Sequence, residues 1–315
     1  MNKCLYCYKQ LKENETDFHK LCSRKIFGTN IAPLLPYNEE QMLELADRVI
    51  KSQVTVTGVQ PKLSLNLEKI SVNDRPQRFT IVGLWGEYIL KPPTKKYPDL
   101  PENEDLTMHL ATLSGIKTVP HSLIRLESGK LSYITKRIDR LNGKKIHMED
   151  MCQLTEKLTE QKYLGSYEQI AKVIIKFSAN PLLDTIDFFE QLIFCFLTGN
   201  ADMHLKNFSL IKHNKNEYIL SPAYDLVSSA LVVKEDDEDL ALTLNGKKKK
   251  IKQKEFIKSM ELFKLEQKVI ANIFSKFNKS IPKWLAFIEM SFLPEKTKEI
   301  YKELIIERAN RLEIN

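Results

Sequence analysis

The chain has 315 residues, of which 43% are hydrophobic and 28% are charged, and its formal net charge is +7. This length allows two lobes with separate cores, and the composition is that of an ordinary globular protein. No apolar run reaches the roughly 20 residues of a membrane-spanning helix, which argues against a membrane protein. The start of the chain lacks the apolar segment of a signal peptide, and five cysteines do not indicate a disulfide scaffold. We therefore expect a cytoplasmic protein.

The first 30 residues form a small Cys/His segment with two closely spaced pairs, Cys4 with Cys7 and His19 with Cys22. Three thiolates and one imidazole at this spacing could hold a structural Zn²⁺ in a tetrahedral site. The alternative is four reduced side chains in a small hydrophobic cap. The sequence leaves both readings open.

Residues 31–138 are predicted to form an N-terminal lobe. A helix is expected over 39–51 and a strand over 63–67, since alternate residues there are apolar. The segment 55–62 between them contains Gly58 and Lys62. As a turn before a strand it could cover nucleotide phosphates, with Lys62 and backbone N–H groups as the ligands; the alternative is an ordinary hairpin.

Two more strands, 79–82 and 87–90, precede Lys91. A lysine at the end of a central strand can reach the α- and β-phosphates of ATP. The following helix, predicted over 102–113, carries Glu104. We expect Glu104 either to pair with Lys91 or to lie on the surface.

Residues 139–315 are predicted to form a mostly helical C-terminal lobe, after a strand pair over 123–126 and 131–135. Helices are expected over 167–177 and 184–197. An acidic run over 235–239 predicts a solvated loop, and Asn245-Gly246 predicts a type I′ hairpin turn. The lysine-rich run over 247–254 is either solvated or a contact for an acidic partner or nucleic acid, and no DNA-reading motif accompanies it.

The stretch from Gly199 to Ser209 carries the strongest chemical signal. Asp202 and Asn207 are five positions apart between a predicted helix and a predicted strand, and Asp225 follows 18 positions after Asn207. A kinase catalytic loop has this arrangement: Asp202 would orient and deprotonate an acceptor hydroxyl, while Asn207 and Asp225 would hold Mg²⁺. His204 and Lys206 lie inside the loop and could touch the nucleotide; the alternative for His204 is a packed or capping role.

The string GNADMHLKNFSL, with YDL downstream, resembles the HipA family of serine/threonine kinase toxins. The upstream strings TVTGVQPKLSL, ILKP and ENE extend the resemblance over roughly residues 50–310. The short form called HipT, of HipBST-type toxin–antitoxin systems, is the most similar. The resemblance implies an α+β fold, two-lobed and protein-kinase-like, with a β-sheet in the N-lobe and a mostly helical C-lobe.

The resemblance also assigns ATP-binding roles to further residues. It places the phosphate loop at Thr57, Gly58, Val59 and Gln60, the adenine-binding hinge at Lys136, Arg137 and Ile138, and Tyr224 beside the metal-binding Asp225. It implies autophosphorylation near the phosphate loop, where this chain has Thr55 and Thr57 in place of serines. Ala201 before Asp202 and Leu226 after Asp225 depart from a typical eukaryotic kinase.

The partners follow from the resemblance alone. It implies a protein substrate, an aminoacyl-tRNA synthetase phosphorylated on serine, and toxin activity restrained by a HipB-like DNA-binding antitoxin and a small HipS-like antitoxin. DNA would be bound only through the antitoxin. Two alternatives are a small-molecule or lipid kinase with the same ATP site, and a non-catalytic binding module.

Overall fold

The computed structural model describes residues 2–42, 44–45, 62–68, 77–82, 86–141, 143–233 and 237–314. The chain divides into two compact units. The first contains residues 1–105, 119–143 and 290–292, and the second contains 106–118, 144–289 and 293–315. Helix α3 (Leu100–Leu113) begins in the first unit and continues into the second.

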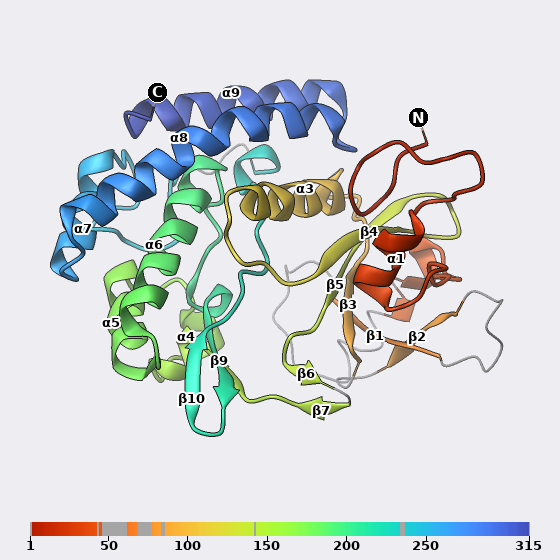
Figure 1. Cartoon of the computed structure of the whole chain (residues 1–315), viewed down its shortest axis with the longest axis horizontal. Coiled ribbons are helices and arrows are strands. Elements are labelled where there is room, and N and C mark those ends of the chain that lie inside the picture. The colour runs from red at the N-terminus through yellow and green to blue at the C-terminus, as the bar shows by residue number, and fades with distance from the viewer. Residues whose placement is uncertain are drawn as a thin grey trace. The chain divides into compact units, whose positions relative to one another are not determined.

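A five-stranded antiparallel sheet forms the centre of the first unit (Figure 1). Its strands are β1 (Leu63–Leu67), β2 (Phe79–Val82), β3 (Tyr88–Lys91), β4 (His121–Arg125) and β5 (Leu131–Lys136), in the order β2-β1-β3-β5-β4. Leu63 and Leu65 are buried and Ser64 between them is partly exposed, as the alternation predicts, whereas Leu67 is partly exposed. The short strand β6 (Arg140–Leu141) lies near the end of this unit. Lys91 is the last residue of β3, so the strand ends one position later than predicted.

The N-terminal segment packs on this sheet through helix α1 (Lys20–Phe27). The ring of Phe27 contacts those of Phe79 and Tyr88 at centroid distances of 5.8 and 6.2 Å. The Tyr88 hydroxyl donates to the backbone carbonyl of Ile26 at 3.2 Å. Gly28 ends the helix in the left-handed conformation, at φ 78°. Of the helix predicted over 39–51, residues 39–42 and 44–45 are helical and the rest lie outside the described residues.

The second unit is mostly helical. Its helices are α4 (Met151–Leu154), α5 (Tyr167–Phe177), α6 (Pro181–Leu197), α7 (Gln253–Leu262), α8 (Gln267–Met290) and α9 (Glu295–Arg311), with 3₁₀ turns η1 (Thr159–Gln161), η2 (Leu205–Asn207) and η3 (Ser229–Leu231). Strand β7 (Lys144–Lys145) precedes a three-stranded sheet of β8 (Met148–Asp150), β9 (Ser209–Asn214) and β10 (Glu217–Leu220), in the order β10-β9-β8. The predicted α+β class is confirmed.

The hairpin predicted at Asn245-Gly246 is confirmed by its backbone. Both residues have positive φ, 48° and 75°, as a type I′ turn requires. Leu244 and Lys247 exchange both backbone hydrogen bonds across the turn, at 2.8 and 3.0 Å. The turn therefore has the conformation that its two central residues favour.

The lysine run after this turn is partly neutralised by nearby carboxylates. Lys247 pairs with Glu255 at 2.7 Å, and Lys248 pairs with Glu238 at 3.3 Å. Lys249 forms an ion pair with Asp237. Paired lysines attract a polyanion less strongly than unpaired ones, which favours the solvated-loop reading.

In the part of the chain that the structure describes, none of the helices has both the length and the apolar character needed to cross a membrane.

Candidate functional site

The loop that contains Asp202 follows α6, the most apolar helix of the second unit. Residues 188–189 and 192–197 of α6 are fully buried. Gly199 then reverses the chain at φ 66°. A Cβ on Gly199 would lie 2.7 Å from Leu304 of α9 and 2.9 Å from Ala230 of η3, so a side chain is excluded by contact as well as by conformation. The glycine therefore lets the loop leave the helix against two neighbouring elements.

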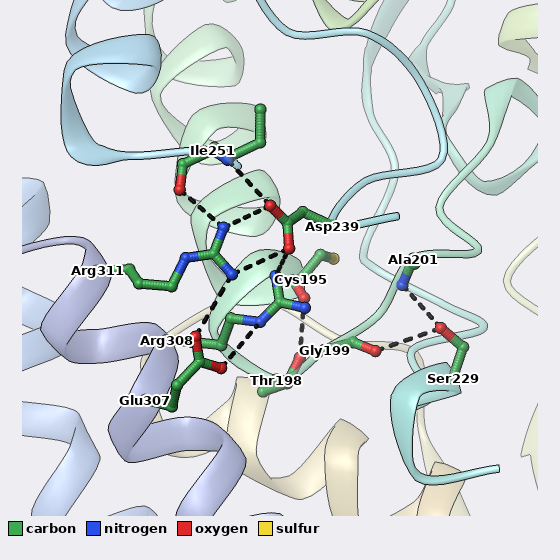
Figure 2. Close-up of polar contacts among 10 residues, drawn as sticks. All are labelled: Cys195, Thr198, Gly199, Ala201, Ser229, Asp239, Ile251, Glu307, Arg308 and Arg311. Carbon is green, nitrogen blue, oxygen red and sulfur yellow. Dashed lines mark hydrogen bonds and ion pairs between the residues drawn. The ribbon is translucent and has the colours of Figure 1, made fainter. Parts of the chain in front are cut away.

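Backbone contacts with η3 hold the loop in place. The N–H of Ala201 donates to Ser229 Oγ at 2.8 Å, and Ser229 Oγ donates to the carbonyl of Gly199 at 3.3 Å (Figure 2). The N–H of Ala230 donates to the same carbonyl at 3.0 Å. These bonds hold Gly199 and Ala201, which lie three positions and one position before Asp202.

A buried charge cluster lies beside the last turn of α6. Figure 2 shows Arg308 and Arg311 of α9 converging on the carboxylate of Asp239, each at 2.5 Å. Both guanidinium groups also lie over the ring of Phe196, at 4.8 and 5.0 Å. The backbone N–H of Ile251 is a further donor to Asp239, at 2.9 Å. The expectation of a solvated loop over 235–239 is therefore wrong at Asp239, because two arginines remote in sequence compensate its burial.

Asp202 and Asn207 have a defined mutual orientation. The side-chain amide of Asn207 donates to the backbone carbonyl of Asp202 at 3.0 Å. The N–H of Asp202 in turn donates to Asn200 Oδ1 at 3.2 Å. Asn207 is buried and Asp202 is exposed. Because the Asn207 nitrogen faces the Asp202 carbonyl, its side-chain oxygen points away from that carbonyl. The exposed carboxylate of Asp202 is open to an acceptor group.

Tyr163 also contacts Asp202 and His204, a contact that the sequence did not indicate. The Tyr163 hydroxyl donates to Asp202 Oδ1 at 2.5 Å, and its ring packs edge-on against His204 with centroids 5.0 Å apart. Tyr163 is 41% exposed and lies 39 positions before Asp202. A tyrosine hydroxyl thus lies where the hydroxyl of an acceptor would be expected to bind.

Asp225, which is 23 positions after Asp202 in sequence, lies close enough to His204 to act on its charge. Its backbone has φ 55°, a left-handed conformation that aspartate tolerates better than most residues. Burial lowers the pKa of His204 to about 4, although the nearby carboxylates of Asp202 and Asp225 act to raise it. His204 itself is buried. Its Nδ1 is buried without a hydrogen-bond partner among the described residues.

The oxygen donors of Asn207 and Asp225 fit a magnesium ion by their chemistry. Mg²⁺ prefers hard oxygen ligands and is usually held by one or two carboxylates together with phosphates of the substrate. An amide oxygen and a carboxylate meet that preference.

Lys206 and Tyr224, both predicted to lie at the nucleotide site, have hydrogen-bond partners within the protein. The Lys206 ammonium pairs with Asp150 at 2.8 Å, and Asp150 is also the N-cap of α4. The Tyr224 hydroxyl donates to the carbonyl of Lys206 at 3.0 Å and shares a 2.5 Å hydrogen bond with Ser209. Both side chains connect the loop to β9 and α4. Neither role was predicted from the sequence.

The phosphate-binding lysine predicted in the first unit is buried in an ion pair. Lys91 Nζ lies 2.5 Å from Glu104 Oε1, and the two residues are 4% and 2% exposed. The ring of Tyr133 lies beneath the ammonium group at 5.4 Å. The predicted pairing of Lys91 with Glu104 is confirmed, and surface exposure of Glu104 is excluded. A buried ion pair of this kind holds the lysine in one position.

The hinge segment offers fewer free backbone donors than the resemblance implied. The N–H of Lys136 donates to the carbonyl of Pro120 and that of Arg137 to the carbonyl of Glu87, both at 2.8 Å. An adenine ring would therefore rely on the Ile138 N–H or on carbonyl groups.

The other residues predicted to bind phosphate or metal lie in three separate parts of the chain. Lys62 is exposed and directly precedes β1. Thr55, Thr57, Gly58, Val59 and Gln60 lie outside the described residues. Cys4, Cys7, His19 and Cys22 come together in the first unit, with their ligand atoms all within 4.8 Å of one another.

Comparison with known proteins shows the family of the chain. The family described as HipA-like C-terminal domain matches residues 54–285. A protein of Haemophilus influenzae named as a candidate kinase is 31% identical over 248 residues, covering 72% of this chain and 68% of the relative. The serine/threonine-protein kinase toxin HipA of Shewanella oneidensis is 29% identical over 198 residues, covering 56% of this chain but only 44% of the toxin.

Solved structures show the same fold. The Shewanella oneidensis toxin–antitoxin structure of HipA, HipB and operator DNA contains a chain that matches with a TM-score of 0.68 at 22% identity, covering 89% of this chain and 73% of that one. The Helicobacter pylori proinflammatory kinase CtkA matches with a TM-score of 0.52 at 18% identity, covering 71% and 87%. The predicted kinase-like fold is thereby confirmed. Because the family match spans well over half of its length, the chain belongs to the HipA-like kinase family.

Proposed function

We propose that this protein is an ATP-dependent serine/threonine protein kinase that acts as the toxin of a toxin–antitoxin system. The observation that carries the proposal is the hydrogen bond from Asn207 to the Asp202 carbonyl. It fixes the Asn207 amide against the backbone of Asp202, whose carboxylate is exposed, and Asp225 lies near His204 of the same loop. The names of the relatives point to the same reaction.

In this reaction the residues supply position and charge. Asp202 would accept a hydrogen bond from the acceptor hydroxyl and take its proton as the oxygen attacks the γ-phosphorus. A new P–O bond to the acceptor forms while the P–O bond to the β-phosphate oxygen breaks, which releases ADP. Lys91 and Lys62 would neutralise phosphate charge. Asn207 and Asp225 would hold Mg²⁺, which supplies further charge neutralisation when bound.

The buried pair of Lys91 and Glu104 is well suited to this task. Lys91 lies 2.5 Å from the Glu104 carboxylate and is 4% exposed. Because the Lys91 side chain is already ordered, binding of nucleotide phosphates to it would not cost further side-chain entropy. The same pairing couples the position of the lysine to helix α3.

The proposed substrate is a protein, an aminoacyl-tRNA synthetase phosphorylated on serine, so that translation is inhibited in the cytoplasm. The proposed partners are a HipB-like DNA-binding antitoxin and a small HipS-like antitoxin. The structural neighbour from Shewanella oneidensis was solved with HipB and operator DNA, which supports the first of these. The HipS-like partner rests on the resemblance to the short HipT form.

The test is to incubate the purified protein with γ-labelled ATP, magnesium and a bacterial extract. We expect label in a protein band, and mass spectrometry should place it on a serine. The Asp202→Asn variant serves as the matched control and should transfer none. Label found only in small molecules would instead support a small-molecule kinase, and no transfer to any acceptor would overturn the proposal.

A further inference from the structure

The N-terminal segment brings four potential metal ligands to one point. Three sulfurs and one imidazole nitrogen, from Cys4, Cys7, His19 and Cys22, lie within 4.8 Å of one another. Cys4 is fully buried and the other three are partly buried. All three cysteines are free thiols. An intramolecular disulfide would leave one of the three unpaired, whereas a metal ion uses all of them.

The local backbone shapes both ligand pairs. Between Cys4 and Cys7 the chain makes a tight turn: the N–H of Tyr8 donates to the carbonyl of Cys4 at 2.9 Å, and the N–H of Cys4 donates to that of Lys9 at 2.9 Å. His19 is the N-cap residue of α1, and Cys22 lies three positions later on the same face. The His19 side chain makes no capping hydrogen bond to the helix. The turn therefore presents Cys4 and Cys7, and the start of α1 presents His19 and Cys22.

The contact of His19 with the Gln10 carbonyl determines which ring nitrogen faces the sulfurs. Its Nε2 lies 3.1 Å from the carbonyl of Gln10, which only accepts, so Nε2 carries the hydrogen. The lone pair is then on Nδ1, which lies 3.4 Å from the sulfur of Cys7 and 3.7 Å from that of Cys22. Metal-bound histidines commonly donate their other N–H to a carbonyl in this way.

These distances fit a tetrahedral zinc site. Zn–S bonds of about 2.3 Å and Zn–N bonds of about 2.0–2.1 Å place nitrogen and sulfur about 3.6 Å apart in a tetrahedron. The two observed N···S distances, 3.4 and 3.7 Å, lie on either side of that value. We propose that Cys4, Cys7, His19 and Cys22 bind one structural Zn²⁺. Four protein ligands leave no open position, so the ion holds structure and does no chemistry.

The site explains how a short segment is held on the sheet. The carbonyl of Leu5, next to Cys4, accepts a hydrogen bond from the N–H of Leu123 in β4 at 3.3 Å. The Tyr8 hydroxyl, next to Cys7, donates to Asp105 Oδ2 at 2.7 Å. Asp105 directly follows Glu104, the partner of Lys91. Zinc thus fixes a turn whose neighbours contact both β4 and the helix that carries Glu104.

The first measurement is the metal content of the full-length protein, purified without chelators. We expect about one equivalent of zinc, the stoichiometry of a single four-ligand site. Cys22→Ser and His19→Ala should lose it. The matched controls are Cys152→Ser, in α4, and His213→Ala, an exposed histidine on β9, which should both keep it. Asp202→Asn should also keep the metal, so the result is independent of kinase activity.

Substitution with cobalt provides a second measurement, which uses wild-type protein and does not require that any variant folds. Wild-type protein reconstituted with Co²⁺ should show the visible absorption of a tetrahedral, thiolate-coordinated ion. Titrating wild-type zinc protein with a mercurial reagent should release the zinc to an indicator dye. A stable, active wild-type protein without zinc would overturn the proposal, as would zinc content unchanged in Cys22→Ser.

Discussion

At the scale of single residues, the exposed carboxylate of Asp202 is supported by groups that are themselves buried. Asn207 and His204 are buried behind it. Burial lowers the pKa of His204 to about 4. Because Asp202 carries the exposed carboxylate of the loop, it is the group that an acceptor hydroxyl can reach.

Asp202→Asn should abolish phosphoryl transfer while ATP binding persists. The amide keeps the shape of the side chain but cannot take a proton, and loss of a general base costs about 100- to 10,000-fold in rate. Nucleotide binding depends on Lys91, Asn207 and Asp225, which the change leaves in place. Single-turnover kinetics and calorimetry with magnesium–ATP measure the two effects separately. Wild-type turnover in the variant would show that another group is the base.

Tyr163→Phe should improve use of the acceptor. The Tyr163 hydroxyl occupies Asp202 Oδ1, so an acceptor hydroxyl must displace it. Hydrogen bonds to charged groups contribute about 1.5–3 kcal/mol, so we expect a lower KM for the acceptor, by roughly ten-fold or more. The ring contact with His204 is kept by phenylalanine. Steady-state kinetics at saturating ATP test this, with the KM for ATP as the internal control. A fall in kcat at unchanged acceptor KM would mean instead that the hydroxyl orients Asp202.

At the scale of elements, α6, α9 and the loop around Asp239 are joined by a buried charge cluster. Asp239→Asn should destabilise the second unit by about 3 kcal/mol, because two largely buried arginines lose their counter-charge. The urea midpoint measures this. Asp237→Asn is the matched control: its pair with Lys249 is exposed, and exposed pairs contribute at most about 1 kcal/mol. Equal midpoints for both variants would contradict the structural role of the cluster.

The same cluster has a predictable dependence on pH. Burial acts to raise the pKa of Asp239, but its hydrogen bond with Arg311 and the charges of both arginines outweigh burial and hold the pKa below its ordinary value of 3.8. A carboxyl with a lowered folded-state pKa contributes stability above its unfolded pKa and loses it as pH falls through the folded value. The difference in unfolding free energy between wild type and Asp239→Asn should therefore shrink only at strongly acidic pH.

At the scale of the whole molecule, the proposed reaction uses Lys91 and Asp202. Autophosphorylation of Thr55 or Thr57 would report on both. We expect phosphate on one of these threonines after incubation with magnesium–ATP, and none in Asp202→Asn, by mass spectrometry. A phosphate adds about −1.5 to −2 charges and would compete with ATP for Lys62 and Lys91, so activity should fall as it accumulates. Active enzyme without phosphate on either threonine would defeat this prediction.

Much of the local structure followed from the sequence. The helix over 167–177 and the strand over 79–82 have the predicted bounds, and the turn at Asn245-Gly246 has the predicted conformation. The spacing of Asp202 and Asn207 indicated their partnership, and the spacing of the Cys/His pairs indicated a common cluster. Each of these features depends on periodicity or on residues a few positions apart, which short-range backbone geometry places in fixed relation.

Only the tertiary structure decided which charged and polar groups meet across the chain. Tyr163 reaches Asp202 over 39 positions, Arg311 reaches Asp239 over 72, and Lys206 turns to Asp150 rather than outward. The sequence suggested a solvated Asp239 because acidic runs are usually exposed. Burying a charge becomes favourable only when a partner lies within hydrogen-bond reach, and packing supplied partners that no local pattern could indicate.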